Sequence, residues 1–425
     1  MKIRGSMKIK RISAFLLLSS LVMLSGACTK ENDNQINAVD LMSGILPNKT
    51  EGKAADTLFI ENSADFFVQL FKNTINLKDK KNALISPVSV WLALSMTANG
   101  ADNNTLSEME KVLGGSIPIS ELNRYIYTYV NGLPSEEKSK LHIANSIWFK
   151  EGFQVNNNFL QVNADYFGAK AYQSAFDDMT LKDINLWVKL NTYGMIDEIL
   201  DEIPREAILY LINAVAFDAE WKNIYNKTAV GKGEFNNMDG EKQTVDFMAS
   251  EEGVYVEDNQ ATGFIKPYVN DTYSFVALLP KEGVSIESYI ASLSGAGFMD
   301  TLKNAQQETV TVRLPKFSYH YGITMNDALE ALGMPEAFDG EKADFSKMTA
   351  LSMKNLYISK VLHKAFIEVN ERGTKAGAAT AVEIRPASMP PPPKKEVILE
   401  RPFVYAIVDN TTKLPIFMGV VLTLE

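Results

Sequence analysis

A run of small residues late in the chain limits what this sequence can fold into more than any other feature does. Residues 373–381 read GTKAGAATA, and no local propensity explains such a run between two strand-like segments. In alternation over residues 374–385, one face carries only small or apolar side chains and every charge falls on the other face. The buriable face consists of Thr374, Ala376, Ala378, Thr380, Val382 and Ile384. Because the run lacks large side chains and prolines follow at 390–393, we expect a segment that is a strand in one state and a loop in another.

The rest of the chain predicts a mixed α+β fold. Apolar spacing favours a helix through residues 66–71, with Asn62 and Ser63 as candidate N-caps. A second helix is expected to begin after Ser86, which can cap it, with Pro87 at the first helical position. Strand-like runs dominate the second half, which disfavours a regularly alternating parallel α/β fold. The predicted strands cover residues 272–279, 310–314, 357–369, 403–408 and 416–422.

Charge and cysteine content exclude several classes of function. The formal net charge of −10 argues against sequence-independent binding to nucleic acid or to anionic lipid, because both require a basic face. A single cysteine, Cys28, permits neither an intrachain disulfide nor a thiolate metal cluster. Three histidines leave little for a metal site, so we expect no metal and no cofactor. These histidines are His142, His320 and His363.

The N-terminus predicts export and a lipid anchor. Basic residues precede an apolar run at residues 12–24, and small residues follow at 25–27, as in a signal peptide. Cys28 comes next, which resembles a bacterial lipobox although Ser25 stands where leucine is usual. Loss of residues 1–27 would remove five basic and no acidic residues, which takes the charge from −10 to −15. We expect lipidation at Cys28, with ordinary secretion and an incidental cysteine as the alternative.

The chain after Cys28 divides into two expected parts. Residues 28–55 are rich in Asn, Asp, Lys and Gly with little apolar periodicity, which is typical of a flexible tether. Residues 56–425 are expected to form a single folded domain.

Ordered motifs across that domain resemble those of the serpin family. The most informative is the hinge, in which Glu371-Arg372-Gly373-Thr374 leads into an alanine-rich run that ends at Thr380. The other motifs are NALISPVS at 82–89, INLWV at 184–188 with Thr192, LINA at 211–214 leading to Trp221, LPKF at 314–317, ADFS at 343–346, HKA at 363–365, RPF at 401–403 and FMG at 417–419. The chain therefore resembles a serpin over roughly residues 56–425, with a lipoprotein-like N-terminus of bacterial type.

This resemblance implies a fold and an activity. Serpins have three β-sheets, eight or nine helices and an exposed reactive-centre loop, here about residues 371–400. When a target protease cleaves the loop, its first part inserts into the largest sheet and the trapped protease is deformed. The resemblance therefore implies a serine-type endopeptidase inhibitor acting by suicide-substrate trapping, and not an enzyme. The hinge residues would be Glu371, Gly373, Thr374, Ala376, Ala378, Ala379 and Thr380.

The family spacing also predicts the cleaved bond. Seventeen residues counted from Glu371 place the bond between Ala387 and Ser388, and a longer proline-rich part leaves Ser388-Met389 as the alternative. A small residue before the bond suits elastase-like or subtilisin-like proteases. The hinge departs from the family at Lys375 and Gly377, which leaves a serpin-fold binding protein, cleaved as a substrate without trapping, as the alternative function.

The resemblance also assigns a structural cluster and a partner. Serpins have a polar cluster beneath the opening sheet and an aromatic residue where insertion begins. The matching residues are Ser86, Ser89, Asn213 and His363 for the cluster and Trp221 for the aromatic. The expected partner is a serine protease or a cysteine protease. The protein itself is expected to be a monomer that is anchored at a bacterial membrane, on its periplasmic or extracellular face. A hydrolase is disfavoured because the chain has no Gly-x-Ser-x-Gly motif.

Overall fold

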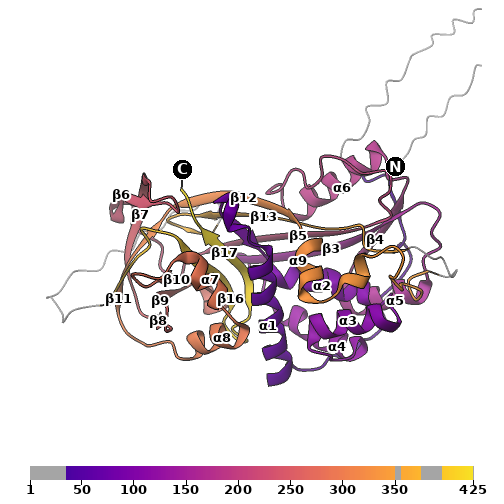
Figure 1. Cartoon of the computed structure of the whole chain (residues 1–425), viewed down its shortest axis with the longest axis horizontal. Coiled ribbons are helices and arrows are strands. Elements are labelled where there is room, and N and C mark those ends of the chain that lie inside the picture. Colours follow the sequence, from indigo (N-terminus) through magenta and orange to yellow (C-terminus); the bar gives the residue numbers. More distant parts are fainter. Residues whose placement is uncertain (1–34, 350–355, 375–394, 425) are drawn as a thin grey trace, which may run out of the picture. The chain divides into compact units, whose positions relative to one another are not determined.

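The computed structural model describes residues 35–349, 356–374 and 395–424. Over these residues the chain forms nine α-helices, four short 3-10 helices and seventeen strands in three sheets, which confirms the predicted α+β fold (Figure 1). The α-helices are α1 (Thr57–Thr74), α2 (Pro87–Ala98), α3 (Asn103–Gly114), α4 (Ile119–Gly132), α5 (Asn157–Phe167), α6 (Asp178–Asn191), α7 (Ile286–Ser292), α8 (Gly295–Lys303) and α9 (Asn326–Leu332).

The largest sheet has seven strands in the order β1-β4-β3-β5-β14-β13-β12. They are β1 (Val39–Asp40), β3 (Ser139–Lys150), β4 (Lys170–Ser174), β5 (Leu209–Glu220), β12 (Phe317–Thr324), β13 (Lys360–Val369) and β14 (Gly373–Thr374). β3 and β5 pair in an antiparallel manner over almost their whole length, whereas β5 and β13 are parallel neighbours from distant parts of the chain.

Two smaller sheets complete the fold. One has the order β2-β17-β16-β10-β9-β8, and the other has the order β15-β11-β7-β6. The strands of the first are β2 (Ala83–Ile85), β8 (Tyr255–Glu257), β9 (Ala261–Pro267), β10 (Tyr273–Pro280), β16 (Phe403–Asp409) and β17 (Pro415–Val421). The strands of the second are β6 (Val230–Asn236), β7 (Lys242–Glu252), β11 (Val310–Pro315) and β15 (Lys395–Ile398). The five strands predicted from apolar runs are therefore confirmed, as β10, β11, β13, β16 and β17.

The seven-stranded sheet is covered on both faces near its centre, by α6 on one face and by α2 on the other (Figure 1). Successive residues of β5 point to opposite faces, as strand geometry requires. Ile212 and Ala214 pack with Trp187 of α6, whereas Leu211 and Val215 belong to the main core on the other face. A strand added beside β5 would therefore be covered on both faces.

The helix starts were predicted with mixed success. α2 begins at Pro87 after Ser86, as predicted, but the Ser86 side chain makes no capping hydrogen bond. α1 begins at Thr57, so the prediction of Asn62 and Ser63 as N-caps is wrong. Asp56 caps the helix by accepting a hydrogen bond from Phe59 N over 2.9 Å.

The predicted tether is wrong from residue 36 onward, because residues 36–55 belong to the compact unit that begins at Ile36. β1 pairs with β4, and Asp183 of α6 accepts hydrogen bonds from the backbone of Asn37 and Ala38 over 3.0 and 2.7 Å. Asp165 of α5 similarly accepts from Asn48 N over 2.6 Å. Backbone and amide hydrogen bonds hold this segment together with scattered apolar side chains such as the buried Met42, so apolar periodicity could not predict its attachment. Residues 28–34 lie outside the described residues.

No helix in the described part of the chain has both the length and the apolar content needed to cross a bilayer.

Candidate functional site

The two central strands of the largest sheet, β5 and β13, pair directly at one end and are separated at the other. Residues 210–214 of β5 pair with residues 360–364 of β13. At the opposite end β14 lies between the two strands, with Gly373 opposite Glu220 and Thr374 opposite both Ala219 and Val369. The segment predicted as a hinge thus begins as a two-residue strand within the central sheet. A longer strand could follow it only if β5 and β13 separated along their shared length.

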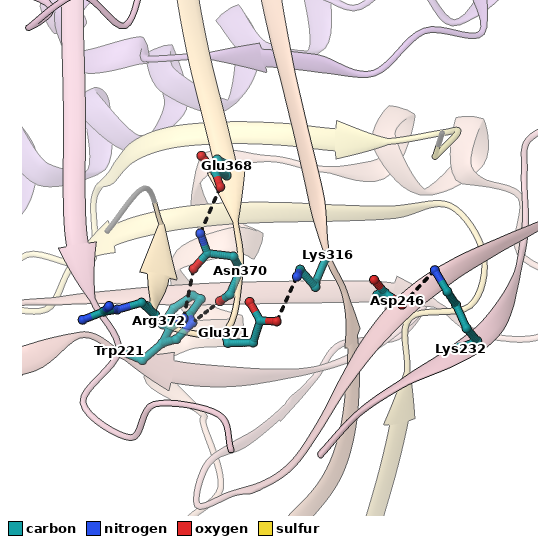
Figure 2. Close-up of polar contacts among 8 residues, drawn as sticks. All are labelled: Trp221, Lys232, Asp246, Lys316, Glu368, Asn370, Glu371 and Arg372. Atoms are coloured by element: carbon teal, nitrogen blue, oxygen red, sulfur yellow. Dashed lines mark hydrogen bonds and ion pairs between the residues drawn. The ribbon is translucent and has the colours of Figure 1, made fainter. Parts of the chain in front are cut away.

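A tight turn at residues 370–372, here called the hinge turn, joins β13 to β14 (Figure 2). Asn370 organises this turn, because its Oδ1 accepts from Arg372 N over 2.9 Å and its backbone N donates to Gly373 O over 3.0 Å. Its side-chain amide also donates to Glu368 Oε1 over 3.0 Å. These local hydrogen bonds reverse the chain direction and place β14 between β5 and β13.

Three N–H groups that follow β5 hold the carbonyls of the hinge turn. Trp221 N donates to Arg372 O over 2.7 Å, and Trp221 Nε1 donates to Asn370 O over 2.9 Å (Figure 2). Tyr225 N donates to Glu371 O over 2.9 Å. The Trp221 ring stacks on Tyr268 with centroids 4.5 Å apart, so its orientation is set by core packing. The sequence-predicted aromatic therefore lies where the hinge enters the sheet.

Gly373 and Thr374 occupy positions that admit few other residues. A Cβ at Gly373 would lie 1.9 Å from Ala219 O, so only glycine fits without movement of β5. Thr374 is 2% exposed, and its hydroxyl lies 2.5 Å from the hydroxyl of Tyr268. The first residue of the buriable face is therefore already buried.

Glu371, the first predicted hinge residue, forms an ion pair with Lys316. Lys316 Nζ lies 2.8 Å from Glu371 Oε1 (Figure 2). Partial burial by itself would raise the pKa of the Glu371 carboxyl, but the hydrogen bond from Lys316, a backbone hydrogen bond and the charge of Lys316 together outweigh it, and the pKa lies below its ordinary value. The carboxylate is therefore charged at neutral pH and ties the hinge turn to the residue that precedes β12.

His363 lies at the closed end of the central pair and bridges three elements. Ser86 N donates to His363 Nε2 over 3.2 Å, so Nε2 carries no proton and Nδ1–H donates to Asn213 Oδ1 over 2.9 Å. Asn213 Nδ2 in turn donates to Asn145 Oδ1 of β3 over 2.5 Å. Burial lowers the pKa of His363 to about 3, so the ring is neutral at physiological pH. This network links β3, β5 and β13 at the point where a new strand would separate β5 from β13.

Only part of the predicted polar cluster is hydrogen-bonded together. Ser86 contributes its backbone N–H, and within the described part of the chain the hydroxyls of Ser86 and Ser89 have no hydrogen-bond partner. Both side chains are fully buried. They leave two hydroxyl groups available beneath the sheet if its strands rearrange.

Several predicted site residues lie outside the described residues. These are Cys28, Ala376, Ala378, Ala379, Thr380, Ala387 and Ser388.

Several residues of this site were missed by the sequence reasoning, among them Tyr225, whose backbone N–H holds Glu371 O. Asn370 precedes the hinge motif, and Lys316 lies within the LPKF motif, so both adjoined recognised signals. Asn145 and Tyr268 carry no such signal, because their contacts with Asn213 and Thr374 join segments far apart in the chain.

This geometry defines a class of protein. In this class a loop begins as a short strand between the two central strands of the largest sheet, and those two strands pair directly with each other farther along. A family model described as "Serpin (serine protease inhibitor)" matches residues 61–424. The chain belongs to the serpin family. An uncharacterized serpin-like protein of Thermococcus kodakarensis is 30% identical over 424 residues, covering 95% of this chain and 97% of that protein. Glia-derived nexin of Mus musculus is 30% identical over 373 residues, covering 83% and 90% of the two chains.

Solved structures of serpins share this architecture. The thermophilic serpin Tengpin in its native state is 55% identical, with a TM-score of 0.88 and coverage of 91% of this chain and 100% of that chain. In its latent state the TM-score is 0.78, with 88% and 100% coverage at 51% identity. The present structure is therefore more similar to the native state. Native protease nexin-1 with heparin is 27% identical, with a TM-score of 0.75 and coverage of 87% and 100%.

Proposed function

We propose that this protein inhibits serine endopeptidases as a suicide substrate, with cleavage near Ala387-Ser388 followed by insertion of the hinge strand into the seven-stranded sheet. The observation that carries the proposal is β14, whose two residues already pair with β5 on one side and β13 on the other. Because strand registers propagate residue by residue, this pair defines the register in which a longer strand would enter.

Extending that register supports an unobstructed insertion. Ala376 would face Phe217, and Ile384 would face Leu209 at the far end of β5. Thr380 would face Asn213 on one side and His363 on the other, and would thus replace their direct hydrogen bond. All residues of this face are small or apolar, so none of them would place a charge in the core.

The same register accounts for the unusual Lys375. The residue would lie on the α6 face opposite Asp218, so the departure from the family's glutamate would meet an acidic neighbour. Opposite charges directly across two strands are mildly favourable. The departure is therefore compatible with insertion and gives no reason to favour a substrate-only protein.

A mixing experiment with an elastase-like protease tests the function. We expect a complex that resists SDS, and mass spectrometry of the released loop peptide should show cleavage after Ala387. The matched variant Ala387→Arg should lose the complex with elastase and form one with trypsin. Cleaved inhibitor beside fully active protease would instead identify a serpin-fold protein that is only a substrate.

We also propose that the chain is exported and held by a lipid on Cys28, on the periplasmic or extracellular face of a bacterial membrane. The signal-like segment before Cys28 and the small residues at its end support this. Mass spectrometry of the mature N-terminus should show Cys28 as the first residue with an acyl adduct. An unmodified cysteine, or processing elsewhere, would contradict the anchor.

A further inference from the structure

One buried ion pair adjoins the hinge and has no part in the mechanism proposed above. Lys266 of β9 and Glu252 of β7 have side chains only 1% and 4% exposed, with Lys266 Nζ 2.7 Å from Glu252 Oε1. Ser250 Oγ donates to the same oxygen over 2.6 Å. Burial lowers the pKa of Lys266, and the charge of Glu252 opposes that effect. Desolvation of two ions offsets their attraction, so stability by itself does not explain such a pair.

The ammonium group of Lys266 also lies over two aromatic rings. Its Nζ is 4.3 Å from the ring centroid of Tyr225 and 5.5 Å from that of Trp221. A cation within about 6 Å of a ring face is attracted by the ring quadrupole, most strongly where water is excluded. Trp221 is 1% exposed and Tyr225 is 6% exposed, so both contacts are desolvated.

Trp221 and Tyr225 are the residues that hold the hinge turn. Their N–H groups donate to the carbonyls of Asn370, Glu371 and Arg372. One of these donors is the Trp221 ring and the other two are the backbone N–H groups of the residues that carry the rings, so a group that fixes both rings restrains all three donors. Glu252 in turn holds the ammonium group in place beneath the rings.

We propose that Lys266, held by Glu252, is a positioning residue whose ammonium group fixes Trp221 and Tyr225 and thereby sets how readily the hinge turn leaves its place beside β5. Only the consequence of this proposal, the ease of loop insertion, rests on the proposed function. The hinge contacts themselves exist without any protease.

Hydrogen exchange of the uncleaved mature protein measures this directly. The amides of Trp221 and Tyr225 are protected by their bonds to the hinge turn, so they exchange when the turn opens. In the neutral double variant Lys266→Met/Glu252→Gln, we expect these two amides to exchange about tenfold faster, or about 1.4 kcal/mol of opening free energy. Amides of β16 and β17 should keep their wild-type rates.

Two further variants separate the cation from the ion pair. Lys266→Glu/Glu252→Lys keeps a pair but moves the ammonium group off the rings, so exchange should again be faster. Lys266→Arg keeps a cation over the rings and should exchange like the wild type. This variant tests the role of the cation even if the reversed pair fails to fold. Wild-type exchange in the neutral variant, or acceleration spread equally over β16 and β17, would overturn the proposal. Failure to form a protease complex would overturn the proposed function and leave these exchange rates unaffected.

Discussion

Thr374→Arg is expected to convert the protein from an inhibitor into a substrate. Thr374 is buried between β5 and β13 with its hydroxyl against Tyr268, so a guanidinium group there would lie unpaired in the core. An uncompensated buried charge costs several kcal/mol, which opposes seating of β14 and entry of the strand behind it. Elastase should therefore still cleave the loop, but the SDS-resistant complex should fall to a few per cent of the wild-type yield.

The control for this variant lies one residue farther on. Lys375→Ala changes the opposite face of the strand and should retain most of the complex, as should Thr374→Ser, which keeps the hydroxyl. Gel densitometry of complex and cleaved inhibitor at equal molar ratios measures both outcomes. Full complex formation by Thr374→Arg would show that this residue does not enter the sheet.

Acidification is expected to weaken the closed sheet through His363. Its pKa of about 3 lies below the unfolded value of about 6.5, so the unfolded chain takes up a proton first as the pH falls. The stability that depends on a neutral His363 is therefore fully present above pH 6.5 and is lost progressively as the pH falls toward 3. The loss should approach about 1.4 kcal/mol of unfolding free energy per pH unit. A proton on Nε2 would also face the Ser86 N–H that now donates to it.

His363→Gln isolates this effect from that of the carboxylates. Glutamine can accept from Ser86 N and donate to Asn213 without titrating. Urea unfolding of both proteins at pH 7.5, 6, 5 and 4.5 should show a steeper loss for the wild type. Parallel pH profiles would mean that the imidazole does not control acid stability.

The sequence predicted some elements well and others poorly, for definite physical reasons. The apolar runs of β10 and β16 identify buried strands locally, because burial on both faces requires continuous hydrophobic residues. The N-terminal segment from Ile36 was misread as a tether because Asp183 and Asp165 hold it through its backbone, which any composition supplies. The start of α1 was misplaced because Asp56 is an equally good cap that lies before the apolar face begins.

The sequence alone determined three features: the alternation that starts at Thr374, the glycine before it and the family motifs. The first two can be recognised locally, because the period of a strand and the space beside its backbone depend on neighbouring residues. Tertiary structure alone decided that Thr374 is already seated between β5 and β13. It also decided that Asn145 completes the His363 network and that Lys266 lies beneath Trp221. Apart from the pairing of Thr374 with Val369, these contacts join residues more than forty positions apart in sequence, and only the packing of the sheets brings them together.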